Sequence, residues 1–126
     1  MPPEPDHPRS QRDWPQRAID IVEAVAKIQR YTAGLDYDGF AVNDLIVDAV
    51  IRNLAIVGEA ARHAPPEVTQ AHPEIPWRLM QRMRNILVHR YASVDLAIVW
   101  DTIQSDLPAL IAALAATAPP QGQSTS

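Results

Sequence analysis

Five residues within one short stretch of the chain combine the side-chain types needed to bind and cleave a phosphodiester: Arg84, Asn85, His89, Arg90 and Tyr91. Arginine binds phosphate through charge-assisted hydrogen bonds, and histidine exchanges a proton near neutral pH. An RNA phosphodiester carries its own nucleophile in the neighbouring 2′-hydroxyl, so cleavage needs only proton transfer and stabilisation of the charged transition state. If the partner is RNA, this stretch can therefore act without a metal ion.

The charge distribution sets this stretch apart. The 126-residue chain has a formal net charge of -4 and a pI of about 5.4, which argues against a surface that attracts nucleic acid as a whole. Between Glu74 and Asp95, however, there is no acidic residue, and the interval holds Arg78, Arg82, Arg84 and Arg90. We name residues 75–94 the basic segment, and we expect Arg78, Arg82 and Arg90 to bind RNA.

The sequence lacks the residues that several other classes of chemistry require. The sequence has no cysteine, which excludes disulfide frameworks, thiolate metal sites and cysteine nucleophiles. There is no glycine-rich phosphate loop and no GxSxG motif. The acids are dispersed, and the histidines outside the basic segment show no metal-ligand spacing; these are His7, His63 and His72. We therefore expect no metal, no cofactor and a reducing, cytoplasmic compartment.

Length and composition indicate one globular domain between two tails. Residues 1–12 are rich in proline and residues 118–126 are polar, so both are expected to be disordered around a helical domain at 13–117. The first residues contain no apolar run, which argues against a secretion signal. We also expect no membrane partner, because charged residues interrupt the hydrophobic stretches: Arg52, Glu59, Asp101 and Asp106.

Four helices and no strand are predicted, at residues 14–33, 43–63, 77–88 and 94–116. Asp13 is expected to cap the first helix and Gly34 to end it. Ser93 is expected to cap the fourth helix, which Pro108 should bend. Short connections then predict an all-α fold, an up-and-down bundle of four principal helices.

The helix predicted at 43–63 separates apolar from charged residues. Its apolar face consists of Ile46, Val47, Val50, Ile51, Leu54, Val57 and Ala61. Asp48, Arg52 and Glu59 form a narrow stripe on the opposite side, with Asp48 and Arg52 in the favourable i, i+4 order. One interpretation of this trio is a solvated ion-pair stripe, and the other is a role in the site.

Arg84 falls on the apolar side of the helix predicted at 77–88, near Trp77 and Met80. A buried guanidinium needs a carboxylate, a carbonyl or a phosphate as its partner, because an uncompensated buried charge is very costly. Arg84 therefore either binds a substrate phosphate or forms a structural pair with Glu59. The residues alone leave both alternatives open.

His89 lies about 140° from Arg84 around an ideal helix, so the two side chains do not converge on a straight helix. Either the helix ends near Val88, or a second chain completes the site. RNA cleavage also needs both a base and an acid, whereas this stretch has one histidine. A twofold dimer would supply two copies.

The run from Arg84 to Tyr91 resembles the RX4HXY motif of HepT-like HEPN proteins, the toxin half of bacterial HEPN/MNT toxin–antitoxin pairs. Other blocks resemble this family in the same order, at 48–54, 56–61, 73–78 and 94–108. The similarity covers about residues 13–117. It implies an all-α HEPN bundle, a homodimer with two motifs facing one cleft, and metal-independent endoribonuclease activity on RNA.

The resemblance also implies roles for individual residues. By the family pattern Arg84 binds and stabilises the scissile phosphate, and His89 acts in proton transfer. Asn85 is a supporting polar residue. Glu59 and Asp48 are candidates for orienting Arg84.

Tyr91 matches the tyrosine that the cognate MNT-type nucleotidyltransferase antitoxin of a type VII-like system converts to O-AMP-tyrosine. The added phosphate places negative charge beside the basic segment and repels the RNA backbone. The chain departs from the usual pattern at Arg90 and Ala92, where the family commonly has glycine and an aromatic residue. The alternative, from a different functional class, is a non-catalytic helical dimer that binds a nucleotidyltransferase or RNA.

Overall fold

The computed structural model describes residues 13–88 and 95–115, with side chains for residues 13–83 and 95–115. Every regular element in these ranges is helical, which confirms the all-α prediction. The elements are α1 (Trp14–Thr32), α2 (Tyr37–Ala41), α3 (Asp44–Ala61), α4 (Pro66–Ala71), α5 (Trp77–Val88), α6 (Leu96–Asp101), the π-helical turn η2 (Thr102–Asp106) and α7 (Leu107–Leu114). Both predicted tails lie outside the described residues.

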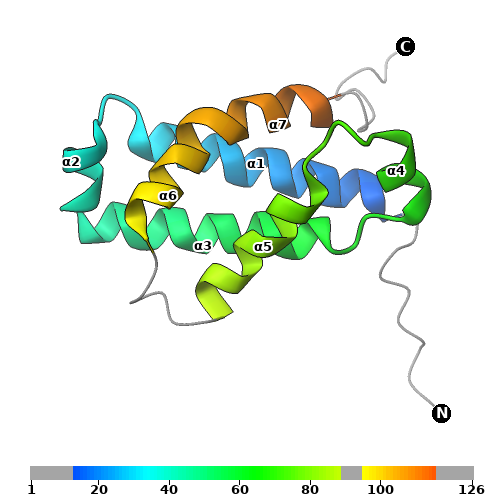
Figure 1. Ribbon diagram of the computed structural model, residues 1–126, viewed down its shortest axis with the longest axis horizontal. Helices are drawn as coiled ribbons and strands as arrows, with labels where there is room; N and C mark the ends of the chain where they lie inside the picture. The colour runs from blue at the N-terminus through cyan, green and yellow to red at the C-terminus, as the bar shows by residue number, and fades with distance from the viewer. Residues whose placement is uncertain (1–12, 89–94, 116–126) are drawn as a thin grey trace.

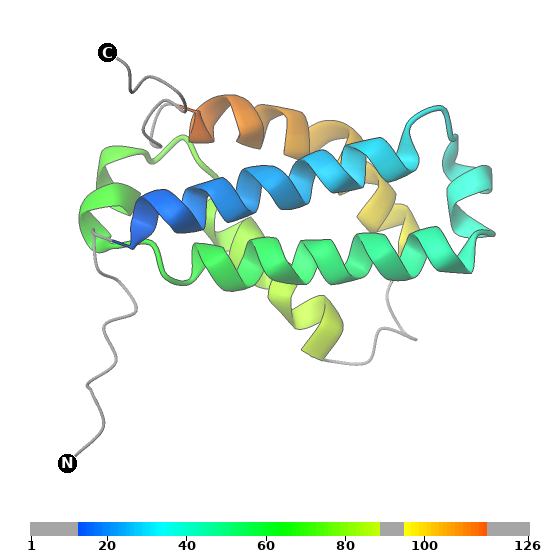
Figure 2. The same ribbon diagram turned by 180° about the vertical axis from the view of Figure 1, so that it is seen from behind.

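The long helices pack around α3. α1 and α3 run antiparallel and side by side, α5 crosses α3 obliquely, and α7 lies along α1 (Figures 1 and 2). Fully buried apolar side chains fill the interior, among them Ile21, Ile51, Leu54, Met80 and Leu110. Burial of each such side chain stabilises the fold by about 1.5–3 kcal/mol. The core therefore holds α5, which carries part of the basic segment, against α3.

α1 begins and ends close to the predicted residues, but its start differs in detail. Asp13 occupies the N-cap position with helical backbone angles (φ -87°, ψ -15°), and its side chain makes no capping hydrogen bond. The expected cap is therefore absent, because a capping side chain usually reaches the first N–H groups from an extended backbone. At the other end Gly34 has φ 80°, a left-handed conformation that glycine adopts readily, and it terminates the helix as predicted.

α3 has the apolar face that the sequence predicts. Six of its predicted residues are buried and Ile46 is partly buried; the six are Val47, Val50, Ile51, Leu54, Val57 and Ala61. Asn43 precedes the helix with an extended backbone, and its side-chain oxygen accepts a 3.1 Å hydrogen bond from the Ile46 N–H. This cap satisfies one of the N–H groups that have no partner within the helix.

Two short helices, α2 and α4, occupy connections for which the sequence predicted no element. Asp36 caps α2 by accepting a 2.8 Å hydrogen bond from the Gly39 N–H, and Pro66 begins α4. Helices of this length are not stable alone, so tertiary contacts must hold them. For α2 the contact is visible: Phe40 is fully buried, and its ring centroid lies 5.2 Å from that of Trp100.

The predicted fourth helix begins at Leu96 rather than at residue 94. Asp95 caps it, because its carboxylate accepts a 2.9 Å hydrogen bond from the Ala97 N–H. Ser93, the predicted cap, lies outside the described residues. An acid two residues further along thus provides the cap for which Ser93 was proposed.

The predicted bend at Pro108 takes the form of the π-helical turn η2. Here the Leu107 N–H donates to the carbonyl of Thr102, five residues back. Proline has no N–H, and its ring would collide with the carbonyl of Gln104 in a regular α-helix. The wider turn accommodates the ring, after which α7 continues the same segment.

The segment Leu96–Leu114 is an exception to the expectation that charged residues interrupt the hydrophobic stretches. An 18-residue window within it has a mean hydropathy of 1.2, so this 19-residue helical segment could cross a membrane by length and composition alone. Asp101 and Asp106 do not interrupt it enough to exclude this. The core helix of a helical bundle passes the same criterion, and the buried side chains of this segment recur on one face: Val99, Ile103, Leu107, Leu110 and Leu114.

Candidate functional site

α5 carries the first half of the basic segment on an amphipathic helix. Met80 and Met83 are buried and Trp77 is half-buried, whereas Arg78 and Arg82 are exposed. This division follows from the spacing of apolar residues by three and four, which places them on one face. The apolar side predicted near Trp77 and Met80 is thus turned toward the interior, and the helix packs against α3.

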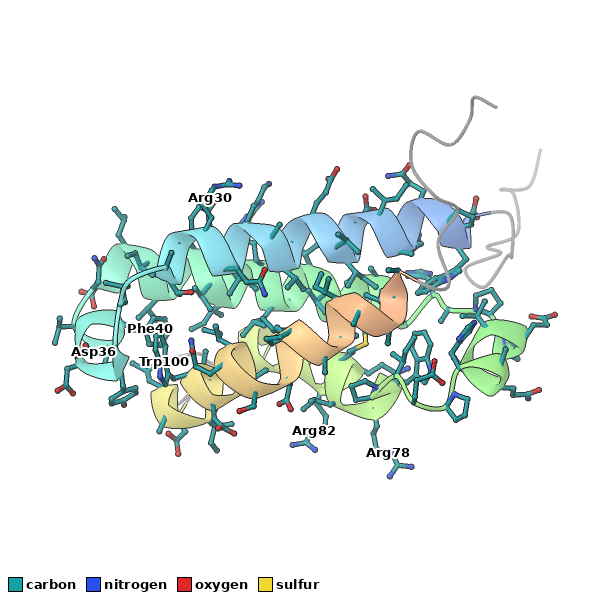
Figure 3. The ribbon with its side chains drawn as sticks, turned by 90° about the horizontal axis from the view of Figure 1, so that it is seen from above. Arg30, Asp36, Phe40, Arg78, Arg82 and Trp100 are labelled. Atoms are coloured by element: carbon teal, nitrogen blue, oxygen red, sulfur yellow. The ribbon has the colours of Figure 1, made fainter. Side chains whose placement is uncertain are left out.

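Arg78 and Arg82 form a cationic stripe on the exposed face of α5. They are one helical turn apart, and both side chains point away from the bundle on the same side (Figure 3). Neither takes part in the ion pairs found among the described residues. Two guanidinium groups without an acidic partner in that part of the chain favour an anion such as a phosphate backbone.

The position of Arg84 follows that of Met80 by four residues and that of Trp77 by seven, all within α5. These intervals place position 84 on the stripe of the helix that carries two apolar residues, as predicted. The side chains of Arg84 and Asn85 lie outside the described residues. All of segment 89–94 does so too, including His89, Arg90 and Tyr91, so the roles of these residues stay predictions.

Glu59 is engaged at the C-terminal end of α3. Its carboxylate forms an ion pair with Arg62 at 3.1 Å and lies 3.3 Å from Nε2 of His63. His63 was not predicted as a neighbour of this acid, although the i, i+4 spacing was a usable signal. The side chain of His63 is 15% exposed and that of Glu59 is 45% exposed, so the pair is partly shielded from water. Pairing of Glu59 with Arg84 stays a prediction.

Asp48 and Glu59 lie too far apart to orient the same guanidinium. They are eleven residues apart on α3, which corresponds to about 16 Å along the helix axis. At most one of the two predicted supporting roles can therefore apply to Arg84 within one protomer. The ion pairs found among the described residues do not include one between Asp48 and Arg52, which the interpretation as an ion-pair stripe would require.

Glu74 lies in the connection that leads into α5. The pKa of this carboxyl is lowered from its ordinary value of 4.5, first because it accepts a hydrogen bond from its own backbone N–H and further because of His72, whose Nδ1 lies 3.3 Å away. The group is at the surface, so it belongs to the turn rather than to an enclosed site. Within the described part of the chain, no three His, Cys, Asp or Glu side chains gather as metal ligands would.

Comparison with known proteins covers most of this helical bundle. The sequence model of a family described as Ribonuclease HepT-like matches residues 21–117. A probable ribonuclease HepT from Thermococcus cleftensis is 40% identical over 102 residues, which are 81% of this chain and 90% of that protein. A protein from Methanocaldococcus jannaschii that is named as a candidate RNase is 36% identical over 99 residues, 79% of this chain and 91% of that protein.

A third relative, a candidate RNase from Caldanaerobacter subterraneus, is 34% identical over 77 residues, 61% of this chain and 69% of that protein. No solved structure matches the chain significantly. The family match includes the stretch from Arg84 to Tyr91 and all the long helices but the first turns of α1. It confirms the resemblance inferred from the sequence: the chain belongs to the ribonuclease HepT-like family.

Proposed function

We propose that this protein is a metal-independent endoribonuclease, active in the cytoplasm as the toxin of a type VII-like HEPN/MNT toxin–antitoxin system. The observation that carries the proposal is the position of the RX4HXY stretch, Arg84 to Tyr91, within the region matched by the ribonuclease HepT-like family. The exposed Arg78 and Arg82 support it, because they extend positive charge from that stretch along α5.

The proposed reaction uses the 2′-hydroxyl of the substrate RNA as its nucleophile. A base accepts the hydroxyl proton as the 2′-oxygen attacks phosphorus, and an acid donates a proton to the departing 5′-oxygen. The products are a 2′,3′-cyclic phosphate and a 5′-hydroxyl, so no atom comes from a cofactor. Arg84 binds the non-bridging oxygens and stabilises the charge that develops on them.

A homodimer explains how one motif performs two proton transfers. In a twofold dimer the same surface meets itself, so two copies of segment 84–91 can share one cleft. The two His89 side chains then divide the base and acid roles. Mixed dimers with one wild-type and one His89→Ala protomer should therefore be nearly as inactive as the fully substituted dimer, which cleavage by purified heterodimers would measure.

Neutralisation by a nucleotidyltransferase antitoxin is the regulatory part of the proposal. Attack of the Tyr91 hydroxyl on the α-phosphorus of ATP, with loss of the hydroxyl proton and release of pyrophosphate, attaches a negatively charged phosphodiester two residues from His89. This charge repels the RNA backbone from the basic segment. The intact mass of the protein co-expressed with the nucleotidyltransferase should rise by whole AMP units, and Tyr91→Phe should abolish the increase.

The deciding experiment is cleavage of total cellular RNA in excess chelator by the dimeric protein expressed without its nucleotidyltransferase. His89→Ala should lower the rate by roughly two orders of magnitude or more, the usual effect of losing a general acid or base. His72→Ala is the matched control, because this histidine lies in the connection before α5 and pairs with Glu74. It should leave the rate unchanged.

Two outcomes would contradict the proposal in different ways. Full activity of His89→Ala would remove His89 from the reaction. Absence of cleavage by an unmodified, dimeric wild type would support the alternative of a non-catalytic dimer that binds RNA or a nucleotidyltransferase.

A further inference from the structure

A pocket of about 320 Å³ lies where the end of α3, α4 and the first turns of α5 meet. Its walls combine two guanidinium groups, a hydroxyl, an amide and an indole ring, from Arg62, Arg78, Thr69, Gln81 and Trp77. None of the described residues that line it is acidic. This combination disfavours a cation and suits a ligand that has both an anionic group and a flat polar ring.

The cationic part of the pocket has hydrogen-bond donors available. Arg78 is exposed and forms none of the ion pairs found in the described ranges. Arg62 contacts Glu59 through a single nitrogen, Nη1, at 3.3 and 3.1 Å from the two carboxylate oxygens. A guanidinium has five N–H donors, so Arg62 keeps others for a phosphate.

The indole of Trp77 is held in place from two sides. Its Nε1 donates a 3.0 Å hydrogen bond to the carbonyl of His72, and its ring lies 5.7 Å from that of Trp14, centroid to centroid, at an interplanar angle of 60°. A ring that is already immobilised loses little conformational entropy when a base stacks on it.

The polar groups beside Trp77 match the edge of a base. The Thr69 hydroxyl donates to the carbonyl of Pro66 at 3.1 Å, which leaves its oxygen as an acceptor. The amide of Gln81 can both donate and accept. A volume of about 320 Å³ is at the lower end of the usual range for small-molecule sites, so the pocket has room for one nucleotide and not for several.

We infer that this pocket is a subsite that binds one nucleotide of the RNA strand cleaved at the Arg84–His89 motif, with its phosphate on Arg78 and Arg62 and its base against Trp77. The inference rests on the proposed ribonuclease function. Arg78 precedes Arg84 by six residues on α5, about 9 Å along the axis. Arg82 adds a second positive charge to the exposed face of α5 beside Arg78 (Figure 3), so we expect a strand that leaves the motif to reach the pocket over this face.

The test measures the binding of a fluorescein-labelled, 2′-O-methyl octaribonucleotide, which lacks the 2′-hydroxyl nucleophile and cannot be cleaved. Arg78→Ala should weaken binding about tenfold, the effect of losing one charge-assisted phosphate contact. The slope of log Kd against log salt concentration should fall by about 0.7, the value for one phosphate of a single strand. Arg30→Ala is the matched control, because Arg30 is an exposed helical arginine on the opposite side of the bundle (Figure 3).

Cleavage kinetics and fluorescence provide independent readouts. Arg78→Ala should lower kcat/KM about tenfold for an octaribonucleotide and by a clearly smaller factor for a dinucleotide, which is too short to reach the pocket. RNA should quench the tryptophan emission of the wild-type protein, and Trp77→Phe should remove most of that quenching.

Failure of the subsite and failure of the ribonuclease function give different results. Equal affinity and equal salt slope in Arg78→Ala and Arg30→Ala would overturn the subsite, even if RNA is cleaved normally. A wild type that binds the octamer with the predicted dependence on Arg78 but cleaves no RNA would overturn the ribonuclease function alone. Failure of the wild type to bind the octamer would overturn both.

Discussion

The attachment of α5 to α3 can be tested by truncating one side chain, Met80. This residue is fully buried and precedes Arg84 by one helical turn. Met80→Ala removes the apolar atoms beyond Cβ and leaves a cavity, which should lower the free energy of unfolding by about 2–5 kcal/mol. A domain of this size has a total stability of about 5–15 kcal/mol. The melting temperature should therefore fall by about 10–20 °C.

Urea denaturation followed by far-ultraviolet circular dichroism measures this change, at one fixed protein concentration because the proposed dimer would make stability depend on concentration. Met80→Leu keeps most of the side-chain volume and should cost less than about 1.5 kcal/mol. Arg82→Ala, two residues further along the same helix but exposed, should change stability by no more than about 0.5 kcal/mol. If Met80→Ala were as stable as Arg82→Ala, the packing of α5 on α3 through Met80 would be refuted.

Three further predictions concern the elements around α5. Asn43→Ala should destabilise the protein by about 1 kcal/mol in urea denaturation, because Asn43 caps α3, whereas Asn43→Asp should retain most of the stability. Gly34→Ala should cost about 1–2 kcal/mol from backbone strain alone, because Gly34 has φ 80° and nothing lies within 4 Å of the added Cβ; a neutral substitution would contradict this. The carboxyl of Glu74 should titrate below pH 4.5 by NMR, and a lowered pKa should persist in His72→Ala because the largest cause is the backbone N–H of Glu74 itself. Since the folded-state pKa is depressed, Glu74 stabilises the fold above its unfolded-state pKa, and this contribution disappears as the pH falls through the folded-state value.

The apolar spacing of the sequence was sufficient to predict the long helices and their buried faces. The predicted bounds of α5, 77–88, agree with Trp77–Val88, and the buried face of α3 agrees residue by residue except that Ile46 is only partly buried. This works because a helix of several turns has one wide apolar face, and burial of that face is favourable against almost any partner. The motif from Arg84 to Tyr91 was also readable, because its residues are close in sequence.

The short helices were missed because their stability is not local. Nothing in the sequence around Phe40 indicates that its ring will be buried against Trp100, sixty residues further along. The local sequence likewise does not indicate which residues lie next to the solvent-facing side of α5. From the sequence, Arg78 and Arg82 are two cations on a helix, and Thr69 is an ordinary residue in a connection.

The amino-acid sequence by itself determined the helical class, the buried faces of α3 and α5, and the residue types available for phosphate chemistry. Only the tertiary structure decided which residues of separate elements meet: Phe40 with Trp100, and Arg62, Thr69 and Trp77 around one pocket. Helical periodicity depends on residues three and four positions apart, so the sequence predicts which side of a helix is apolar. A pocket is built from separate helices, and its composition depends on how the whole core packs them together.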